Sequence, residues 1–305
     1  MAERDRGTSD VPEVPFGTVV GVDYMIVRPL RRGGTGAVYV AEQLSTAVHR
    51  ALKILHPDYI RNEELYKRFE REAQVGARIA SEHVTQVIGA GVDKKLQLPW
   101  LSMELLEGQD LRDHVEERGS VAPGLVLEIF EQLCHALGKA HAIGIVHRDL
   151  KPANVFLSTS RSVRGGTMVK VLDFGIARVT TEKLTLSGAP LGTPAWMAPE
   201  QVLGEPATPA SDVWALGLLA FYLLTGKSFW RGVARGADQF EIAREVLHDP
   251  IPIAVARAIE LEVSGGIPPG FNEWFALAVA RNPAERFGSA NAAFAALQRT
   301  LSPAA

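Results

Sequence analysis

The first hundred residues alternate between short apolar runs and turn-forming residues, a pattern that predicts a small antiparallel sheet. β-Branched and aromatic residues over 24–42 are interrupted by a glycine-rich turn, which indicates two strands joined as a hairpin. Further strands are predicted over 51–55, 84–92 and 98–105. Residues 63–79 place apolar side chains at helical spacing among many charges, so this segment is predicted to be a helix with one buried stripe.

After the first hundred residues the apolar positions change to a helical period. The clearest helices are predicted over 126–142 and 211–224, with short strands over 155–157 and 169–172. Residues 225–269 are the least regular, and their helices are hard to place from the pattern. The chain is therefore predicted to be α+β, with a small sheet lobe, a larger mostly helical lobe, and a cleft between them where a ligand could bind.

These patterns divide the chain into three segments. Residues 1–17 are rich in charge, Pro, Gly and Ser, and they offer too little apolar surface to offset the entropy of ordering, so they are predicted to be disordered. The sheet lobe is expected over 18–106 and the helical lobe over 107–300.

Composition narrows the class of protein without identifying a partner. The 305 residues are 47% hydrophobic and carry a formal net charge of −3, which gives no general attraction to nucleic acid or to an anionic membrane. The single cysteine, Cys134, cannot form an internal disulfide and is predicted to pack in the core. The most apolar run, 213–224, is too short to span a membrane. The chain as given is expected to be cytoplasmic, although a longer parent protein could carry an anchor.

The strongest chemical signal is the run from His147 to Asn154, followed one short hairpin later by Asp173. Phosphoryl transfer needs an aligned acceptor oxygen, magnesium on the phosphates and neutralised charge on the transferring group. Asp149 could accept the hydroxyl proton, and Lys151 could balance charge on the γ-phosphate. Asn154 and Asp173 offer hard oxygen ligands suited to Mg²⁺.

These residues resemble the catalytic loop and magnesium-binding motif of the eukaryotic-type protein kinase family, and most of all its bacterial members. The resemblance implies a two-lobed kinase fold that uses ATP with Mg²⁺, or with Mn²⁺ as an alternative metal. Lys151 and the downstream Thr193 resemble the serine/threonine branch, which implies protein substrates that bear Ser or Thr. A homodimer is one arrangement that the resemblance allows for autophosphorylation.

The resemblance also implies a set of nucleotide-binding residues, most of them in the first lobe. Lys53 would bind the α- and β-phosphates, and Glu72 would form an ion pair with the Lys53 ammonium group. Arg31 departs from the pattern, because the family usually has a glycine there. The other residues implied to contact the nucleotide belong to the glycine-rich loop, the adenine pocket, the hinge or the ribose site, and they are Gly33, Gly34, Gly36, Val38, Ala51, Phe156, Met103, Glu104, Leu106 and Asp110.

Residues 173–200 resemble the family's activation and substrate-docking segment. Arg148 lies directly before Asp149, where a cation could anchor a phosphorylated segment. The candidate acceptors are Thr180, Thr181, Thr185 and Ser187. Two matches have structural roles by resemblance: Asp212 braces the catalytic loop, and Arg286 pairs with Glu200.

Two other functions remain open at this point. Arg31 and Gly76 favour a pseudokinase, a nucleotide-binding scaffold without turnover, since both positions depart from the family pattern. A small-molecule phosphotransferase of related fold is disfavoured by the docking segment that ends in Ala198-Pro199-Glu200. The scattered histidines show no metal-ligand spacing and are expected to be structural or exposed; they are His49, His56, His83, His114, His135 and His141.

Overall fold

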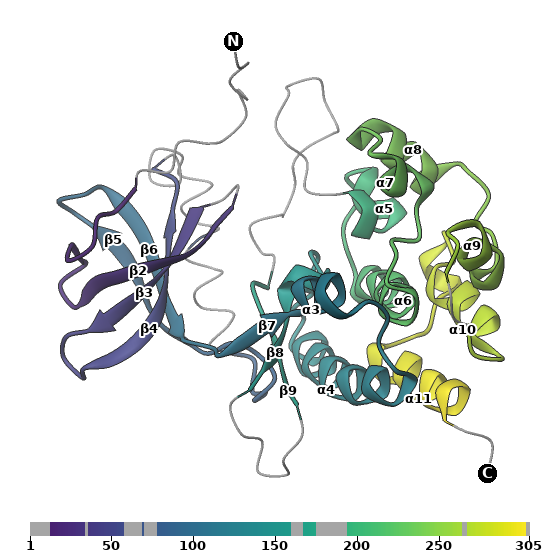
Figure 1. The fold of residues 1–305 in the computed structure, drawn as a ribbon, viewed down its shortest axis with the longest axis horizontal. Coiled ribbons are helices and arrows are strands. Elements are labelled where there is room, and N and C mark those ends of the chain that lie inside the picture. Colours follow the sequence, from purple (N-terminus) through teal and green to yellow (C-terminus); the bar gives the residue numbers. More distant parts are fainter. Residues whose placement is uncertain are drawn as a thin grey trace. The chain divides into compact units, whose positions relative to one another are not determined.

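The computed structural model describes residues 13–33, 36–57, 69, 78–159, 167–174, 194–263 and 267–302 (Figure 1). The chain is α+β, as the sequence predicted, and it divides into two compact units. Unit 1 comprises Met1–Arg78 and Thr85–Glu107, and unit 2 comprises Ile79–Val84 and Gly108–Ala305.

Unit 1 is built on one antiparallel sheet with the strand order β1-β2-β3-β4-β6-β5. Its strands are β1 (Val19–Val20), β2 (Tyr24–Gly33), β3 (Gly36–Gln43), β4 (Val48–Leu55), β5 (Val87–Asp93) and β6 (Leu98–Glu104). The predicted hairpin and the strands over 51–55 and 98–105 are confirmed. The helix predicted over 63–79 lies almost entirely outside the described residues. Within that range, Phe69 and Arg78 are described as helical.

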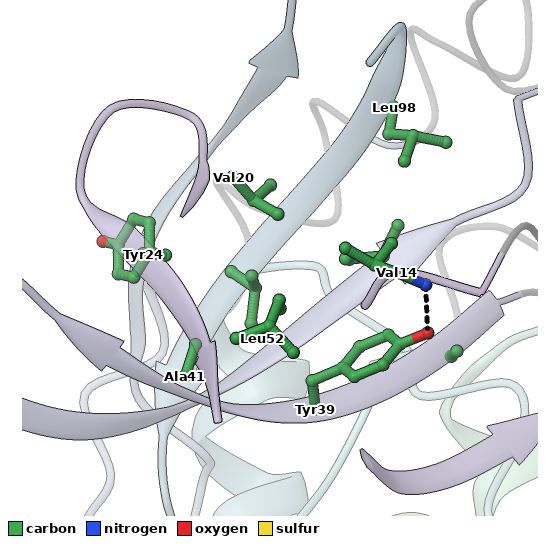
Figure 2. Packing of buried hydrophobic residues seen from close by; sticks show 10 residues of the cluster. Val14, Val20, Tyr24, Tyr39, Ala41, Leu52 and Leu98 are labelled. Carbon is green, nitrogen blue, oxygen red and sulfur yellow. Dashed lines mark hydrogen bonds between the residues drawn. The ribbon is translucent and has the colours of Figure 1, made fainter. Parts of the chain in front are cut away.

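One face of this sheet forms a buried apolar core to which the segment before β1 contributes (Figure 2). Val14 is 5% exposed and packs with Tyr39, Leu52 and Leu98, and its amide N–H donates to the Tyr39 hydroxyl at 3.2 Å. The prediction of disorder up to residue 17 was therefore too long. Residues 13–17 are held by the buried Val14 side chain, by this hydrogen bond and by the Gly17 N–H, which donates to the Ile26 carbonyl at 2.9 Å, whereas residues 1–12 lie outside the described part.

Tyr39→Phe is expected to destabilise this attachment. Loss of the hydroxyl leaves the buried N–H of Val14 without its acceptor, which costs about 1–2 kcal/mol of unfolding free energy. Chemical denaturation of the wild type and the variant measures the difference. Equal unfolding free energies would show that the hydroxyl does not hold the segment.

Unit 2 combines a small sheet with a bundle of helices. The sheet runs β7-β8-β9, antiparallel, from β7 (Gly108–Asp110), β8 (Val155–Ser158) and β9 (Met168–Val171). The helices are α3 (Leu111–Arg118), α4 (Pro123–Ala142), α5 (Pro199–Val202), α6 (Pro209–Thr225), α7 (Arg231–Arg235), α8 (Gln239–Leu247), α9 (Ala254–Glu260), α10 (Phe271–Ala278) and α11 (Ala290–Leu301). The predicted helices over 126–142 and 211–224 are confirmed as α4 and α6.

Helix α6 lies at the centre of unit 2 and is apolar on nearly all sides because other elements cover it. Trp214 on α6 stacks against Trp230 with ring centroids 6.1 Å apart, and Phe221 packs against Phe229 and Phe275. Cys134 is fully buried on α4, as predicted, and burial raises the pKa of its thiol. No helix among the described residues is both long enough and apolar enough to cross a lipid bilayer.

Residues 79–84 belong to unit 2, although the sequence placed them in the first lobe. Val84 forms a parallel bridge with Val171, and the Val171 N–H donates to the His83 carbonyl at 2.7 Å. The His83 ring contacts the Val169 carbonyl through Nδ1 at 3.2 Å. The strand predicted over 84–92 therefore begins only at Val87, because the backbone before it is engaged by β9.

Candidate active site

In unit 1, several of the predicted nucleotide-binding residues share one face of the sheet. Strand pairing sets Lys53 between Val38 and Leu101, and sets Ala51 between Val40 and Met103. Lys53 is only 8% exposed, which is rare for a lysine unless its ammonium group has a role or a partner. Toward β5 the same face carries the apolar cluster of Leu55, Phe69, Leu101, Val87 and Met103.

The β2–β3 hairpin approaches β4 so closely that glycine is required at its base. A Cβ on Gly36 would lie 2.2 Å from the Ile54 carbonyl oxygen, well inside van der Waals contact. Gly33 pairs with Gly36 across the hairpin, whereas Gly34 lies outside the described residues. The close approach to β4 explains Gly36 without a ligand, so the nucleotide role of these glycines stays a prediction.

The predicted hinge begins with the last two residues of β6, Met103 and Glu104. Met103 is half-buried beside Phe69, and the Glu104 N–H donates to the Gln86 carbonyl at 3.0 Å. The Glu104 carboxylate in turn accepts the Gln86 N–H at 2.8 Å. The Glu104 N–H is therefore engaged within the protein, and the adenine contacts of Glu104 and Leu106 stay predictions.

In unit 2, Asp212 fixes the backbone of the loop that precedes Asp149. Its two carboxylate oxygens accept the N–H groups of His147 and Arg148, each at 2.9 Å. The Asp212 carboxylate also contacts His141 Nε2 at 2.7 Å, so His141 has the structural role expected of it. Asp212 is 1% exposed at the start of α6, and the predicted brace is confirmed.

The loop brings Asp149, Lys151 and Asn154 into direct contact. Lys151 Nζ lies 2.8 Å from Asp149 Oδ2. Asn154 Nδ2 donates both to the Asp149 backbone carbonyl at 2.8 Å and to Oδ2 at 3.1 Å. Pro152 opens a 3₁₀ turn over Pro152–Asn154 that holds this arrangement. The carboxylate of Asp149 is thus fixed in one orientation by two neighbouring donors.

Asn154 and Asp173 lie at the same end of the β8–β9 hairpin. The N–H of Leu172 donates to the Asn154 carbonyl at 2.9 Å, which places Asp173 one residue beyond that contact. Asp173 has a positive φ of 41°, a conformation that turns the chain sharply after β9. His147 supports this turn, since its ring packs 4.8 Å from Phe174 and Nε2 contacts the Leu172 carbonyl.

The side chains of Asn154 and Asp173 suit Mg²⁺, which needs few protein ligands, better than a metal that is coordinated entirely by protein side chains. With Nδ2 of Asn154 bonded to Asp149, the amide oxygen is the atom left to face a ligand. Within the described residues there is no group of three or more His, Cys, Asp or Glu that could hold a metal. Mg²⁺ commonly binds through one or two protein oxygens together with substrate phosphates and water. The predicted pair therefore fits the ion.

Asp110, the predicted ribose contact, caps the first helix of unit 2. It is 2% exposed, and its Oδ1 accepts the Asp113 N–H at 2.9 Å at the start of α3. The structure thus gives Asp110 a structural role, and its ribose contact stays a prediction. Phe156 lies half-buried on β8 in unit 2, with Gly108 packed against its ring.

Arg148 is a partly buried cation next to Asp149. Burial lowers the pKa of its guanidinium, while the charge of Asp212 acts in the opposite direction. Its Nε is buried with no hydrogen-bond partner among the described residues. Gln201, which the sequence analysis missed, donates to the Arg148 carbonyl at 2.8 Å. Its position directly after Ala198-Pro199-Glu200 was the available signal.

Glu200 and Arg286 form the predicted pair in the core of unit 2. The two guanidinium nitrogens donate to the two carboxylate oxygens at 2.7 and 2.8 Å. Burial alone would raise the pKa of Glu200, but hydrogen bonds from Arg286 and Ser211 outweigh it and hold that pKa below its ordinary value. Arg286 also lies over the ring of Trp214, 5.1 Å from its centroid.

Several predicted residues lie outside the described part of the chain. They are Glu72, Gly34, Gly76, Gly175, Thr180, Thr181, Thr185, Ser187 and Thr193. The Lys53–Glu72 pair and the phosphorylation sites therefore stay predictions.

Residues 24–293 match the protein kinase domain family, so the chain belongs to that family. Its fold agrees with this, because the crystal structure of the Mycobacterium tuberculosis PknI kinase domain superposes with a TM-score of 0.71 at 27% identity, covering 94% of this chain and all of that one.

The most similar relatives include bacterial serine/threonine-protein kinases. PknL of M. tuberculosis is 36% identical over 276 residues, covering 90% of this chain and 65% of PknL. Pkn1 of Myxococcus xanthus is 37% identical over 288 residues, covering 93% of this chain and 39% of Pkn1. The chain thus spans less than two thirds of the length of these relatives.

Proposed function

We propose that the chain is an ATP- and magnesium-dependent serine/threonine protein kinase that transfers the γ-phosphoryl group of ATP to hydroxyl groups of proteins. In this proposal residues 18–106 bind the nucleotide, while residues 107–300 carry the catalytic groups and bind the protein substrate. The relatives named as serine/threonine-protein kinases support the choice of acceptor.

The arrangement around Asp149 carries the proposal. Its carboxylate is oriented by Lys151 and Asn154, and the backbone of the two residues before it is anchored by Asp212. A fixed carboxylate can align a substrate hydroxyl and accept its proton as the phosphoryl group is transferred. Lys151, already beside Asp149, can then neutralise charge that develops on the γ-phosphate.

The remaining groups hold the nucleotide and its metal. Asn154 and Asp173 would bind Mg²⁺, which when bound neutralises phosphate charge and fixes the phosphates for in-line transfer. Mn²⁺ has the same preference for oxygen ligands and is an alternative. Lys53 would bind the α- and β-phosphates from the sheet face of unit 1, beside Val38 and Ala51.

We further propose that activity is raised by phosphorylation of the segment between Asp173 and Glu200, including autophosphorylation between two copies of the chain. Arg148, next to Asp149, supports this, because its Nε is buried and has no hydrogen-bond partner among the described residues. A phosphate group supplies strong acceptors for a guanidinium. The candidate acceptors are Thr180, Thr181, Thr185 and Ser187.

Lys53→Met tests the nucleotide part of the proposal. We expect phosphoryl transfer to fall by about 100-fold or more, because a preorganised cation on the phosphates is lost. Transfer of radiolabelled phosphate from ATP to a generic basic protein measures this. Lys94→Met, which removes an exposed lysine of the same unit, is the matched control and should retain activity. Equal activities of the two variants would contradict the role of Lys53.

A further inference from the structure

Arg31 lies on the same face of the unit 1 sheet as the residues proposed to bind ATP. From the hairpin inward the pairing is continuous, with Gly33 opposite Gly36, Arg32 opposite Ala37 and Arg31 opposite Val38. Val38 in turn pairs with Lys53. Because residues directly opposite in a ladder point to the same side, Arg31, Val38 and Lys53 form one cross-strand row. The irregularity in β2 falls before Arg31 and leaves this row intact.

The neighbouring arginine points to the opposite side. Ala37, the partner of Arg32, is 2% exposed and belongs to the apolar core on the other face of the sheet. The Arg32 guanidinium forms an ion pair with Glu13 at 3.0 Å, in the segment that also packs on that face. Because successive side chains of a strand point to opposite faces, the adjacent residues Arg31 and Arg32 lie on opposite faces of the sheet.

We propose that Arg31 is a second phosphate-binding cation, which contacts the polyphosphate of the nucleotide together with Lys53. This inference rests on the proposed function only in that this face binds ATP. The Cα atoms of Arg31 and Lys53 are two strand spacings apart, about 10 Å. Side chains as long as those of Arg and Lys can converge from that separation on a single polyphosphate.

The chemistry of the row favours an extended anion. Two cations on one sheet face, flanking a valine, suit a ligand that carries several negative charges along its length. A guanidinium offers five N–H donors in a planar fork that matches phosphate oxygens. Arg31 is exposed, so its guanidinium lies at the surface of this sheet face. Arg31 would thus strengthen the binding of a nucleotide in proportion to its number of phosphates. The glycine that is usual at this position contributes no charge.

Calorimetric titration of the whole chain with ATP, ADP and adenosine, in the presence of Mg²⁺, tests the inference. For Arg31→Ala we expect ATP to bind about 5- to 20-fold more weakly, ADP to lose less, and adenosine to change by less than about twofold. Raising the salt concentration should narrow the difference for ATP. Arg32→Ala is the matched control, since it removes the same charge one residue away on the opposite face. It should bind all three ligands as the wild type does.

Four results would overturn the inference. Equal losses in Arg31→Ala and Arg32→Ala would indicate a general effect of charge. A loss that is the same for adenosine and ATP would indicate altered loop structure, and tighter ATP binding by Arg31→Gly would show that the arginine only obstructs the loop. If the wild type binds no nucleotide, this inference and the proposed function both fail. If the predicted gradient appears without phosphoryl transfer, the inference stands and the kinase activity fails.

Discussion

Asp149→Asn is expected to lower phosphoryl transfer by about 10²- to 10⁴-fold, the range by which a positioned general base accelerates a reaction. The amide cannot accept the hydroxyl proton, and it also replaces the acceptor oxygen that Lys151 and Asn154 contact. The backbone of the loop should be retained, because Asp212 holds it through main-chain N–H groups that the substitution leaves unchanged. Initial rates with ATP and a basic protein substrate measure the loss.

The control for this prediction is Asp249→Asn, which removes one exposed carboxylate that forms an ion pair with Arg244 at 3.8 Å. It should leave the rate unchanged. The thermal unfolding of Asp149→Asn should stay close to that of the wild type, since its effect is on chemistry and not on packing. Normal turnover by Asp149→Asn would refute the assignment of the base.

Arg286→Met should have the largest effect on stability, about 3–5 kcal/mol of unfolding free energy. The side chains of Arg286 and Glu200 are 0% and 6% exposed, so removal of the guanidinium leaves a carboxylate buried without its partner. The same guanidinium also donates to the backbone carbonyls of Ala280 and Ala210. Denaturant unfolding measures the loss. Arg244→Met, at a side chain that is 73% exposed, should change stability by less than about 0.5 kcal/mol.

The pair also predicts how stability depends on pH. Because the pKa of Glu200 is lower in the folded chain than its ordinary value of 4.5, its contribution is complete well above pH 4.5. That contribution is lost as the pH falls below 4.5 and through the folded-state pKa. The wild type should therefore lose stability in acid more steeply than Arg286→Met. Parallel curves of unfolding free energy against pH would show that Glu200 gains nothing from Arg286.

The catalytic loop could be predicted from sequence because its chemistry lies within a few consecutive residues. Asp149, Lys151 and Asn154 are separated by so few bonds that a single turn brings them together. Asp212 and Arg286 lie far along the chain and were recognised only through their resemblance to family positions. The role of Lys53 was likewise recognised through the resemblance, and strand pairing in the structure then added Arg31 to its row.

Contacts that depend on tertiary packing could not be predicted. The cap that Asp110 forms at the start of α3 is one of them, since it depends on how the helix begins after β7. Val14 lies in a polar segment whose composition is typical of disorder, and one buried side chain outweighs that composition. The helices α7 to α9 are five, nine and seven residues long, too short for a helical period to stand out from the sequence.

The most direct test of the central claim is to incubate the wild-type chain with radiolabelled ATP, Mg²⁺ and a basic protein, and to identify the labelled amino acids after acid hydrolysis. The account predicts label on serine and threonine, and none once the divalent cation is chelated. Nucleotide binding without any label on protein would contradict it and would favour a nucleotide-binding scaffold, and label on tyrosine alone would contradict the proposed acceptor.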